Sequence, residues 1–218
     1  MRKNIEKYSK QISEAIKTLP YFRIEDLISM NKDTHYLKIF VYRLKKRGKI
    51  KSIKRGIYVS ENYLNLAEKQ GIINSYYEFL GNILYQPSYL SAEYVLQKYS
   101  ILSESVNSFT LVSRKKTNRF LNDFGSFKYY HIKEDLFTGF ESKNKNGFLI
   151  TEATLAKALF DFLYFRKNIL NSLDEIKSLR LNLENLKPAD LKELKRYIKL
   201  EKSKKMLVIF NWLIELYE

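Results

Sequence analysis

The sequence predicts an α+β fold, with a small helical domain first and a larger mixed domain after it. Three observations carry this prediction. The first sixty residues alternate helical apolar spacing with a short β-rich pair, β-rich pieces fill the middle of the chain, and helical spacing returns towards its end. Apolar residues make up 45% of the chain, which is enough to bury a core despite the high charge.

The N-terminal region predicts two helices before residue 31. Pro20 ends the first of them, and a short second helix is expected over residues 23–30, with Ile24, Leu27 and Ile28 on one side. Six apolar residues at helical spacing define the first helix: Ile5, Tyr8, Ile12, Ala15, Ile16 and Leu19.

A third helix is predicted over residues 34–47. Asp33 is placed to cap its N-terminus, and Gly48 is placed to end it. Its apolar stripe comprises Leu37, Phe40, Val41 and Leu44.

Two β-rich pieces follow the third helix, residues 49–53 and 56–60, and they predict a short hairpin. Helix, short helix, turn, helix and hairpin is the order of elements in a winged helix-turn-helix. We therefore expect a winged-helix domain over residues 1–65, followed by a mixed α+β domain over residues 66–218 that ends in a helical bundle.

The positive charge is concentrated at the N-terminal end. The net charge is +15, and residues 1–60 carry 16 Lys or Arg against five Asp or Glu, whereas the rest carries 23 against 19. Residues 35–60 hold nine Lys or Arg and no acid. This asymmetry indicates a surface for a polyanion, which we expect to be double-stranded DNA. A merely solvated basic helix is the alternative.

The predicted stripe fixes which residues of the third helix face outward. Near the start of the helix they are positioned for base edges in a major groove, and later cations for phosphates. Five residues are expected to read or approach the groove: His35, Lys38, Tyr42, Lys45 and Lys46. Four are expected on phosphates, two of them in the wing: Arg43, Arg47, Lys54 and Arg55.

Residues 64–85 are predicted to be helical, with 61–70 as a connection and 71–85 as an apolar-faced helix. A helix over about 92–99 and then β-rich pieces follow. Asn146-Gly147 is a hairpin signal. Pro188 begins a late helix, and a strongly apolar helix closes the chain. An inward stripe is expected in the helix after residue 151: Leu155, Leu159, Phe162 and Leu163.

The middle of the chain, "YLSAEYVLQKYSILSESVNSFTLVSRKKTNRFLNDFGSFKYYHI", resembles the signature region of AbiEi-like antitoxins. Its matching pieces are Tyr89-Leu90-Ser91, Tyr99-Ser100-Ile101, Thr110–Thr117 and Phe124–Ile132. The later "TLAKALFDFLYF" resembles the family's "EKAL-x-D-x-(L)Y" helix, through Lys157, Ala158, Leu159, Asp161 and Tyr164. Ser100 stands where the family usually has Gly, and Ala156 where it has an acid.

The resemblance covers residues from about 20 to 165. It implies that the chain is a transcriptional regulator and antitoxin of a type IV (AbiE-like) toxin–antitoxin system, a kind of phage-defence system. Such a protein binds the operator upstream of its own operon and represses it, while its C-terminal region counteracts a nucleotidyltransferase-like toxin. A palindromic operator would call for two copies of the chain, as a homodimer or side by side.

Other functions are less supported by the sequence. We expect no enzyme, no catalytic residue, no cofactor and no metal, since the two histidines are far apart and no phosphate-binding or nucleophile motif occurs. A metal-dependent nuclease remains an alternative, built on Asp123 or Asp135 with Glu141 and Lys143. A toxin-sequestering protein without DNA binding, whose basic N-terminus binds an acidic partner, is another.

No secretory signal or membrane span is recognisable, so a soluble, cytoplasmic protein without a membrane partner is expected. A second basic cluster lies in the last helices, where it either forms a solvated face, docks an acidic toxin surface or extends the DNA footprint. It comprises Lys195, Arg196, Lys199, Lys202, Lys204 and Lys205.

Overall fold

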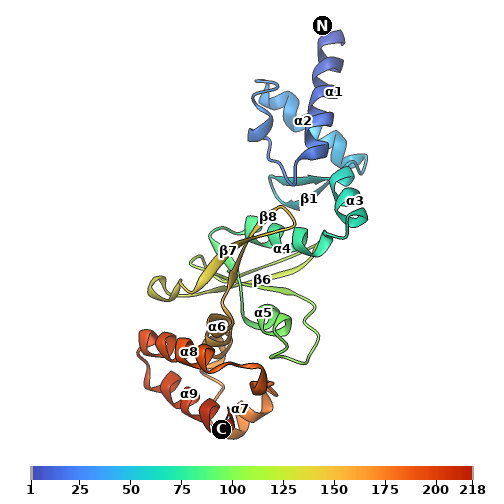
Figure 1. Cartoon of the computed structure of the whole chain (residues 1–218). Coiled ribbons are helices and arrows are strands. Elements are labelled where there is room, and N and C mark those ends of the chain that lie inside the picture. Colours follow the sequence, from blue (N-terminus) through green and yellow to red (C-terminus); the bar gives the residue numbers. More distant parts are fainter. Residues whose placement is uncertain (1, 218) are drawn as a thin grey trace. The chain divides into compact units, whose positions relative to one another are not determined.

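The computed structural model describes residues 2–217, with side chains from Tyr8 on. The chain forms two compact units. Unit 1 runs up to Tyr77 and includes Asn122–Phe124, and unit 2 comprises Glu78–Leu121 and the residues from Gly125 on. Helices and strands both contribute to the fold, so the predicted α+β class is confirmed (Figure 1).

Unit 1 begins with a helix that stops two residues before Pro20, as predicted. The side chain of Ile5, part of the predicted stripe, lies outside the described side chains. The elements of unit 1 are α1 (Arg2–Thr18), the 3-10 turn η1 (Glu25–Leu27), α2 (Thr34–Lys46), β1 (Ile50–Lys54), β2 (Ile57–Ser60), α3 (Glu61–Lys69) and the start of α4 (Ile73–Leu84).

Helix α2 begins and ends where its sequence predicts. The Asp33 carboxylate accepts a hydrogen bond from the backbone N–H of Tyr36 at 3.0 Å, which satisfies a free donor of the first turn. At the other end Gly48 adopts φ +68°, and the N–H groups of Gly48 and Lys49 reach the carbonyls of Lys45 and Leu44, both at 3.0 Å. These two bonds form a Schellman cap, which fixes where the helix stops.

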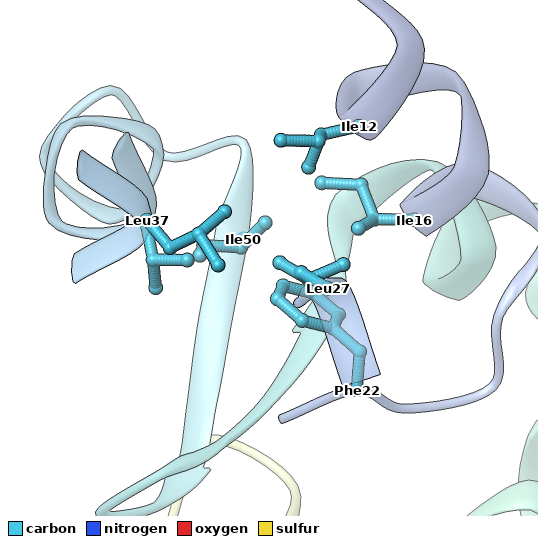
Figure 2. Close-up of a cluster of buried hydrophobic side chains, with 7 residues drawn as sticks. Ile12, Ile16, Phe22, Leu27, Leu37 and Ile50 are labelled. Carbon is cyan, nitrogen blue, oxygen red and sulfur yellow. The ribbon is translucent and has the colours of Figure 1, made fainter. Parts of the chain in front are cut away.

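The core of unit 1 gathers apolar side chains from both helices and the hairpin. Figure 2 shows Ile12 and Ile16 of α1 directed towards Leu37 of α2 and Ile50 of β1. Phe22, Leu27 and Leu37 are all fully buried. Burying such side chains contributes about 1.5–3 kcal/mol each. This packing holds one face of α2 against the core.

Two local predictions for unit 1 are confirmed only in part. Residues 23–30 form no α-helix, because their backbone bonds join residues three apart, as from Leu27 N to Ile24 O at 3.0 Å. Residues 61–70, expected as a connection, mostly form helix α3. The Ser60 hydroxyl caps that helix by accepting from Tyr63 N at 3.1 Å, and Leu64 is buried beneath it.

Strands β1 and β2 form the predicted hairpin. They pair antiparallel from Ile50↔Ser60 to Lys54↔Ile57, with an irregularity between Ser52 and Lys54. The chain before η1 joins this sheet as well. Phe22 and Tyr58 exchange two backbone hydrogen bonds, each at 2.9 Å. The hairpin is thereby fastened to the segment that follows α1.

Unit 2 is built on a six-stranded mixed sheet with the order β5-β6-β4-β3-β8-β7. β3 pairs antiparallel with β4 and parallel with β8, and β4 pairs parallel with β6. Asn146 and Gly147, with φ of +54° and +85°, make the predicted turn between β7 and β8. The strands are β3 (Ser88–Leu90), β4 (Phe109–Ser113), β5 (Asn118–Asn122), β6 (Gly125–His131), β7 (Phe140–Lys145) and β8 (Phe148–Ala153).

Helix α6 is the central helix of unit 2 and packs against α5, α8, α9 and β8 (Figure 1). The predicted inward residues Leu159, Phe162 and Leu163 are buried, but the burial is not limited to that stripe, because every residue from Ala156 to Leu163 is buried. A helix covered on all sides has no solvent face. The helical elements of unit 2 are α5 (Ala92–Lys98), η2 (Glu134–Leu136), α6 (Leu155–Arg166), α7 (Leu173–Ser178), η3 (Leu183–Asn185), α8 (Pro188–Glu201) and α9 (Lys204–Tyr217).

Candidate nucleic-acid interface

The outer face of α2 is rich in Lys and Arg and contains no acid. Leu37 and Val41 are buried on the inner face, so residues on the opposite side of the helix face solvent. Tyr42 is 66% exposed and presents a large aromatic ring. The structure leaves the seven predicted α2 residues exposed: His35, Lys38, Tyr42, Arg43, Lys45, Lys46 and Arg47.

Among the described side chains, no acid pairs with the cations of this face. Helix α2 contains no Asp or Glu, and Asp33 at its N-terminus is engaged in capping. Within the described part of the chain, none of the cations of α2 forms an ion pair. These cations are Lys38, Arg43, Lys45, Lys46 and Arg47. Uncompensated charge on one helix face concentrates positive potential there, which attracts phosphates.

The hairpin adds two further predicted residues at its turn. Arg55 is exposed beside Gly56, which has φ +85°, and Lys54 is half-buried at the end of β1. The Ser52 hydroxyl donates to the Lys54 carbonyl at 2.9 Å, which stabilises the backbone before the turn. Lys51 lies further down the strand and pairs with Glu61 at 3.5 Å. Among the described residues Arg55 at the tip forms no ion pair, whereas Lys51 along the strand is paired with Glu61.

Unit 1 contains two further cations, Lys17 and Lys49, that were not among the predicted DNA-contacting residues. Lys17 and Lys49 join Arg47 around an open cavity of about 430 Å³ between α1, the end of α2 and the start of α3. Lys17 forms an ion pair with Glu14 at 2.7 Å. Lys49 belongs to the acid-free run of residues 35–60, but it lies between α2 and β1, so the helical pattern could not predict which way its side chain faces.

Four residues of the motifs quoted above meet in the interior of unit 2. Lys157 Nζ lies 2.6 Å from Asp161 Oδ1, and both side chains are completely buried. Asp161 Oδ2 accepts hydrogen bonds from the Tyr89 hydroxyl at 3.0 Å and the Ser91 hydroxyl at 2.7 Å. The motifs thus form one buried polar network that joins β3 to α6.

Burial dominates the electrostatics of this network. It raises the pKa of Asp161 and lowers the pKa of Lys157, although each charge favours the ionised form of the other. The Lys157 ammonium also lies 4.6 Å from the ring centroid of Phe160 and 5.5 Å from that of Tyr197. Completely buried groups contact no solvent, so these residues position β3 and α6 relative to each other.

A second ion network in unit 2 is partly open to solvent. Glu78 and Glu152 are almost buried, and each bonds both Lys98 and Lys145. The Tyr94 hydroxyl donates to Glu78 at 2.7 Å. Burial alone would raise the pKa of Glu152, but hydrogen bonds from the two lysines lower it overall. Two carboxylates balanced by two ammonium groups have no net charge to offer a ligand.

The residues of the alternative nuclease site are not brought together as a metal site. Glu141 and Lys143 pair with each other at 3.0 Å and are both 59% exposed on β7. Asp135 lies in η2, and Asp123 belongs to unit 1. Among the described residues, no group of three or more His, Cys, Asp or Glu is arranged to hold a metal ion.

A scan against models of protein families finds no match to this chain, and a search of curated proteins finds none either.

No helix in the part of the chain that the structure describes is long and apolar enough to cross a membrane.

Proposed function

We propose that unit 1 is a winged helix-turn-helix that binds double-stranded DNA and that the chain represses its own operon. Helix α2 would enter the major groove, with His35, Lys38 and Tyr42 nearest the bases. The cations near its C-terminus and those of the wing would contact phosphates. The observation that carries this proposal is the outer face of α2, where the described side chains include exposed cations without ion pairs and one exposed aromatic ring.

The topology of unit 1 supports the same proposal. A helix, a short segment paired with the hairpin, a turn, a capped helix and a two-stranded hairpin follow one another along the chain. The bridge between Phe22 and Tyr58 and the core of Figure 2 hold α2 by its inner face. A rigidly held helix with its outer face free is what groove recognition requires.

We further propose that the chain is an antitoxin of the AbiE-like, type IV class, whose unit 2 counteracts a nucleotidyltransferase-like toxin. The support is the resemblance of residues 89–132 and 154–165 to that family. The structure adds one supporting fact, that Tyr89, Ser91, Lys157 and Asp161 from these motifs form a single buried network. Because this network links β3 to α6, we expect proteins that share this fold to keep the residues that form it.

The DNA proposal is tested by removing charge from the outer face of α2. The variant Lys38→Ala/Lys45→Ala is compared with Lys116→Ala/Lys133→Ala, which removes the same charge from exposed positions of unit 2. Fluorescence anisotropy on a labelled duplex is measured over a salt series. We expect the slope of log K against log salt to fall by about 0.9 for each phosphate that the α2 variant no longer neutralises, and to stay unchanged in the control.

Two results would contradict the proposal. Equal slopes for the α2 variant and the parent would mean that this face does not contact DNA. Loss of binding in the control variant alone would place the DNA surface on unit 2. In the first case the alternative, in which the basic N-terminus binds an acidic protein, would take precedence.

A further inference from the structure

An apolar groove lies between the last two helices of unit 2. The cavity between α8 and α9, which lie side by side in Figure 1, has a volume of about 560 Å³. We call it the α8–α9 groove. Its lining residues are Leu191, Lys192 and Lys195 of α8 and Phe210, Asn211, Ile214 and Glu215 of α9.

The apolar surface extends beyond the groove along α9. Leu207 is 47% exposed, and it precedes Asn211 by four residues and Ile214 by seven, so all three lie on one face of the helix. Leu200 at the end of α8 and Val208 are each 40% exposed. Leu207, on the same face of α9 as the lining residues Asn211 and Ile214, therefore extends the apolar surface of the groove, whereas Leu200 lies on the opposite side of α8 from Leu191.

One edge of the α8–α9 groove carries uncompensated positive charge. Lys192, Lys195 and Lys199 follow each other at helical spacing along α8 and are exposed. Within the described residues, none of these three lysines forms an ion pair. Lys205 differs, because it bonds Asn171 Oδ1 at 2.8 Å. Of the second basic cluster, Lys195 therefore lines the groove, Lys199 lies one helical turn further along α8, and Lys205 has an internal partner.

The acids near this edge are all committed to internal contacts. The Asp190 carboxylate accepts from Lys187 N, Glu193 accepts from the Tyr197 hydroxyl at 2.6 Å, and Glu201 pairs with Lys167 at 2.8 Å. Glu215 lines the opposite wall. The α8 wall therefore offers ammonium groups, and the floor offers aliphatic and aromatic carbon.

From this arrangement we infer that the α8–α9 groove binds an acidic amphipathic helix of a protein partner. The apolar residues of that helix, at i, i+3, i+4 and i+7, would pack on Leu191, Phe210 and Ile214, and its carboxylates would pair with the lysines of α8. An apolar floor with a charged rim is the anatomy of a protein interface. This inference goes beyond DNA binding and holds whether or not unit 1 binds DNA.

Two other occupants fit the groove less well. A DNA backbone would satisfy the lysines but leave the apolar floor and Leu207 without a partner. A second copy of this chain, placed by a two-fold axis, would offer the two lining lysines only Glu215 as an acid of the groove. An acid-flanked helix complements both the charge and the apolar floor.

The test uses the full chain and a fluorescein-labelled synthetic helical peptide, with Leu at the i, i+3, i+4 and i+7 positions and Glu on both flanks. A second peptide carries Lys in place of each Glu. We expect the acidic peptide to bind at least about tenfold more tightly than the basic one. Both Lys195→Glu/Lys199→Glu and Leu207→Asp should weaken its binding by about tenfold.

Matched controls make the same changes elsewhere in unit 2. Lys116→Glu/Lys133→Glu alters the charge equally, and Ile169→Asp alters an apolar side chain that is 65% exposed outside the groove. Both controls should bind like the parent, and circular dichroism should show that all variants are folded. The inference fails if the controls lose as much affinity as the groove variants, because binding would then follow net charge alone.

Two further outcomes would overturn the inference in favour of another occupant. If duplex DNA displaces the acidic peptide and Lys195→Glu/Lys199→Glu abolishes that displacement while α2 variants do not, the groove is a nucleic-acid surface. If sedimentation shows a dimer of the parent that Leu207→Asp dissociates, a second copy fills it. DNA binding through unit 1 is measured separately, so its failure would be distinguishable.

Discussion

Replacing Lys157 by Met would isolate the cost of the buried ion pair in unit 2. Met keeps most of the length and apolar surface of the lysine stem but removes the ammonium that lies 2.6 Å from Asp161. The Asp161 carboxylate would then keep only the hydroxyls of Tyr89 and Ser91 as donors. A completely buried carboxylate without its counter-ion is expected to protonate.

The magnitude follows from that protonation. The ordinary pKa of the carboxyl is 3.8, and each pKa unit corresponds to about 1.4 kcal/mol. Holding Asp161 neutral at pH 7 therefore costs about 4 kcal/mol, within the range of about 3–5 kcal/mol for breaking a buried pair. The raised pKa also sets the sign of the pH dependence. The contribution of Asp161 to stability is present in full below 3.8 and is lost as the pH rises towards the folded pKa.

Urea unfolding followed by the fluorescence of Trp212, the single tryptophan and a residue of α9, measures this effect in unit 2. Lys157→Met should unfold with about 4 kcal/mol less free energy than the parent at pH 7. Between pH 7 and pH 5 it should regain about 1.4 kcal/mol per unit. Adding Asp161→Asn should restore much of the loss and remove the pH dependence. A loss below about 1 kcal/mol, or no pH dependence in the single variant, would refute the buried pair.

Three further predictions address other parts of the structure. Leu37→Ala should lower the free energy of unfolding of unit 1 by about 3 kcal/mol in circular dichroism, and a loss under about 1 kcal/mol would argue against the core of Figure 2. Gly139→Ala should lower the melting temperature by several degrees, because Gly139 has φ +78° and an added Cβ would overlap the Tyr197 hydroxyl; an unchanged melting temperature would contradict that contact. The pKa of Glu152 is lowered in the folded state, so its contribution is present above 4.5 and is lost as the pH falls through the folded pKa. Glu152→Gln should therefore lose less stability than the parent between about pH 4.5 and pH 3, in urea titrations; equal losses would mean that the lysines do not favour the carboxylate.

Local features of the fold could be predicted from short stretches of sequence. Asp33 and Gly48 bound α2, and Asn146-Gly147 makes the β7–β8 turn, because each of these residues acts on backbone within a few positions. The exposure of Lys38 and Tyr42 followed from the period of the stripe on one helix. Such signals need no knowledge of distant segments.

Features that depend on distant segments could not be predicted. Lys157 and Asp161 are spaced like a surface i, i+4 pair, and only the packing of α5, α8 and α9 around α6 makes them buried. Strand β7 was missed because its residues, from Glu141 to Asn144, are polar and exposed, as suits the edge of a sheet. The α8–α9 groove likewise exists only once two helices are packed together.

The central claim, that this protein reads DNA through α2, is tested most directly by fluorescence anisotropy of the full chain on the duplex just upstream of its gene. A scrambled duplex of the same composition is measured beside it over a salt series. We predict tight binding to the upstream duplex that survives physiological salt, where binding to the scrambled duplex is lost. Equal and steeply salt-sensitive binding to both would contradict sequence reading and leave the basic face as an electrostatic surface only.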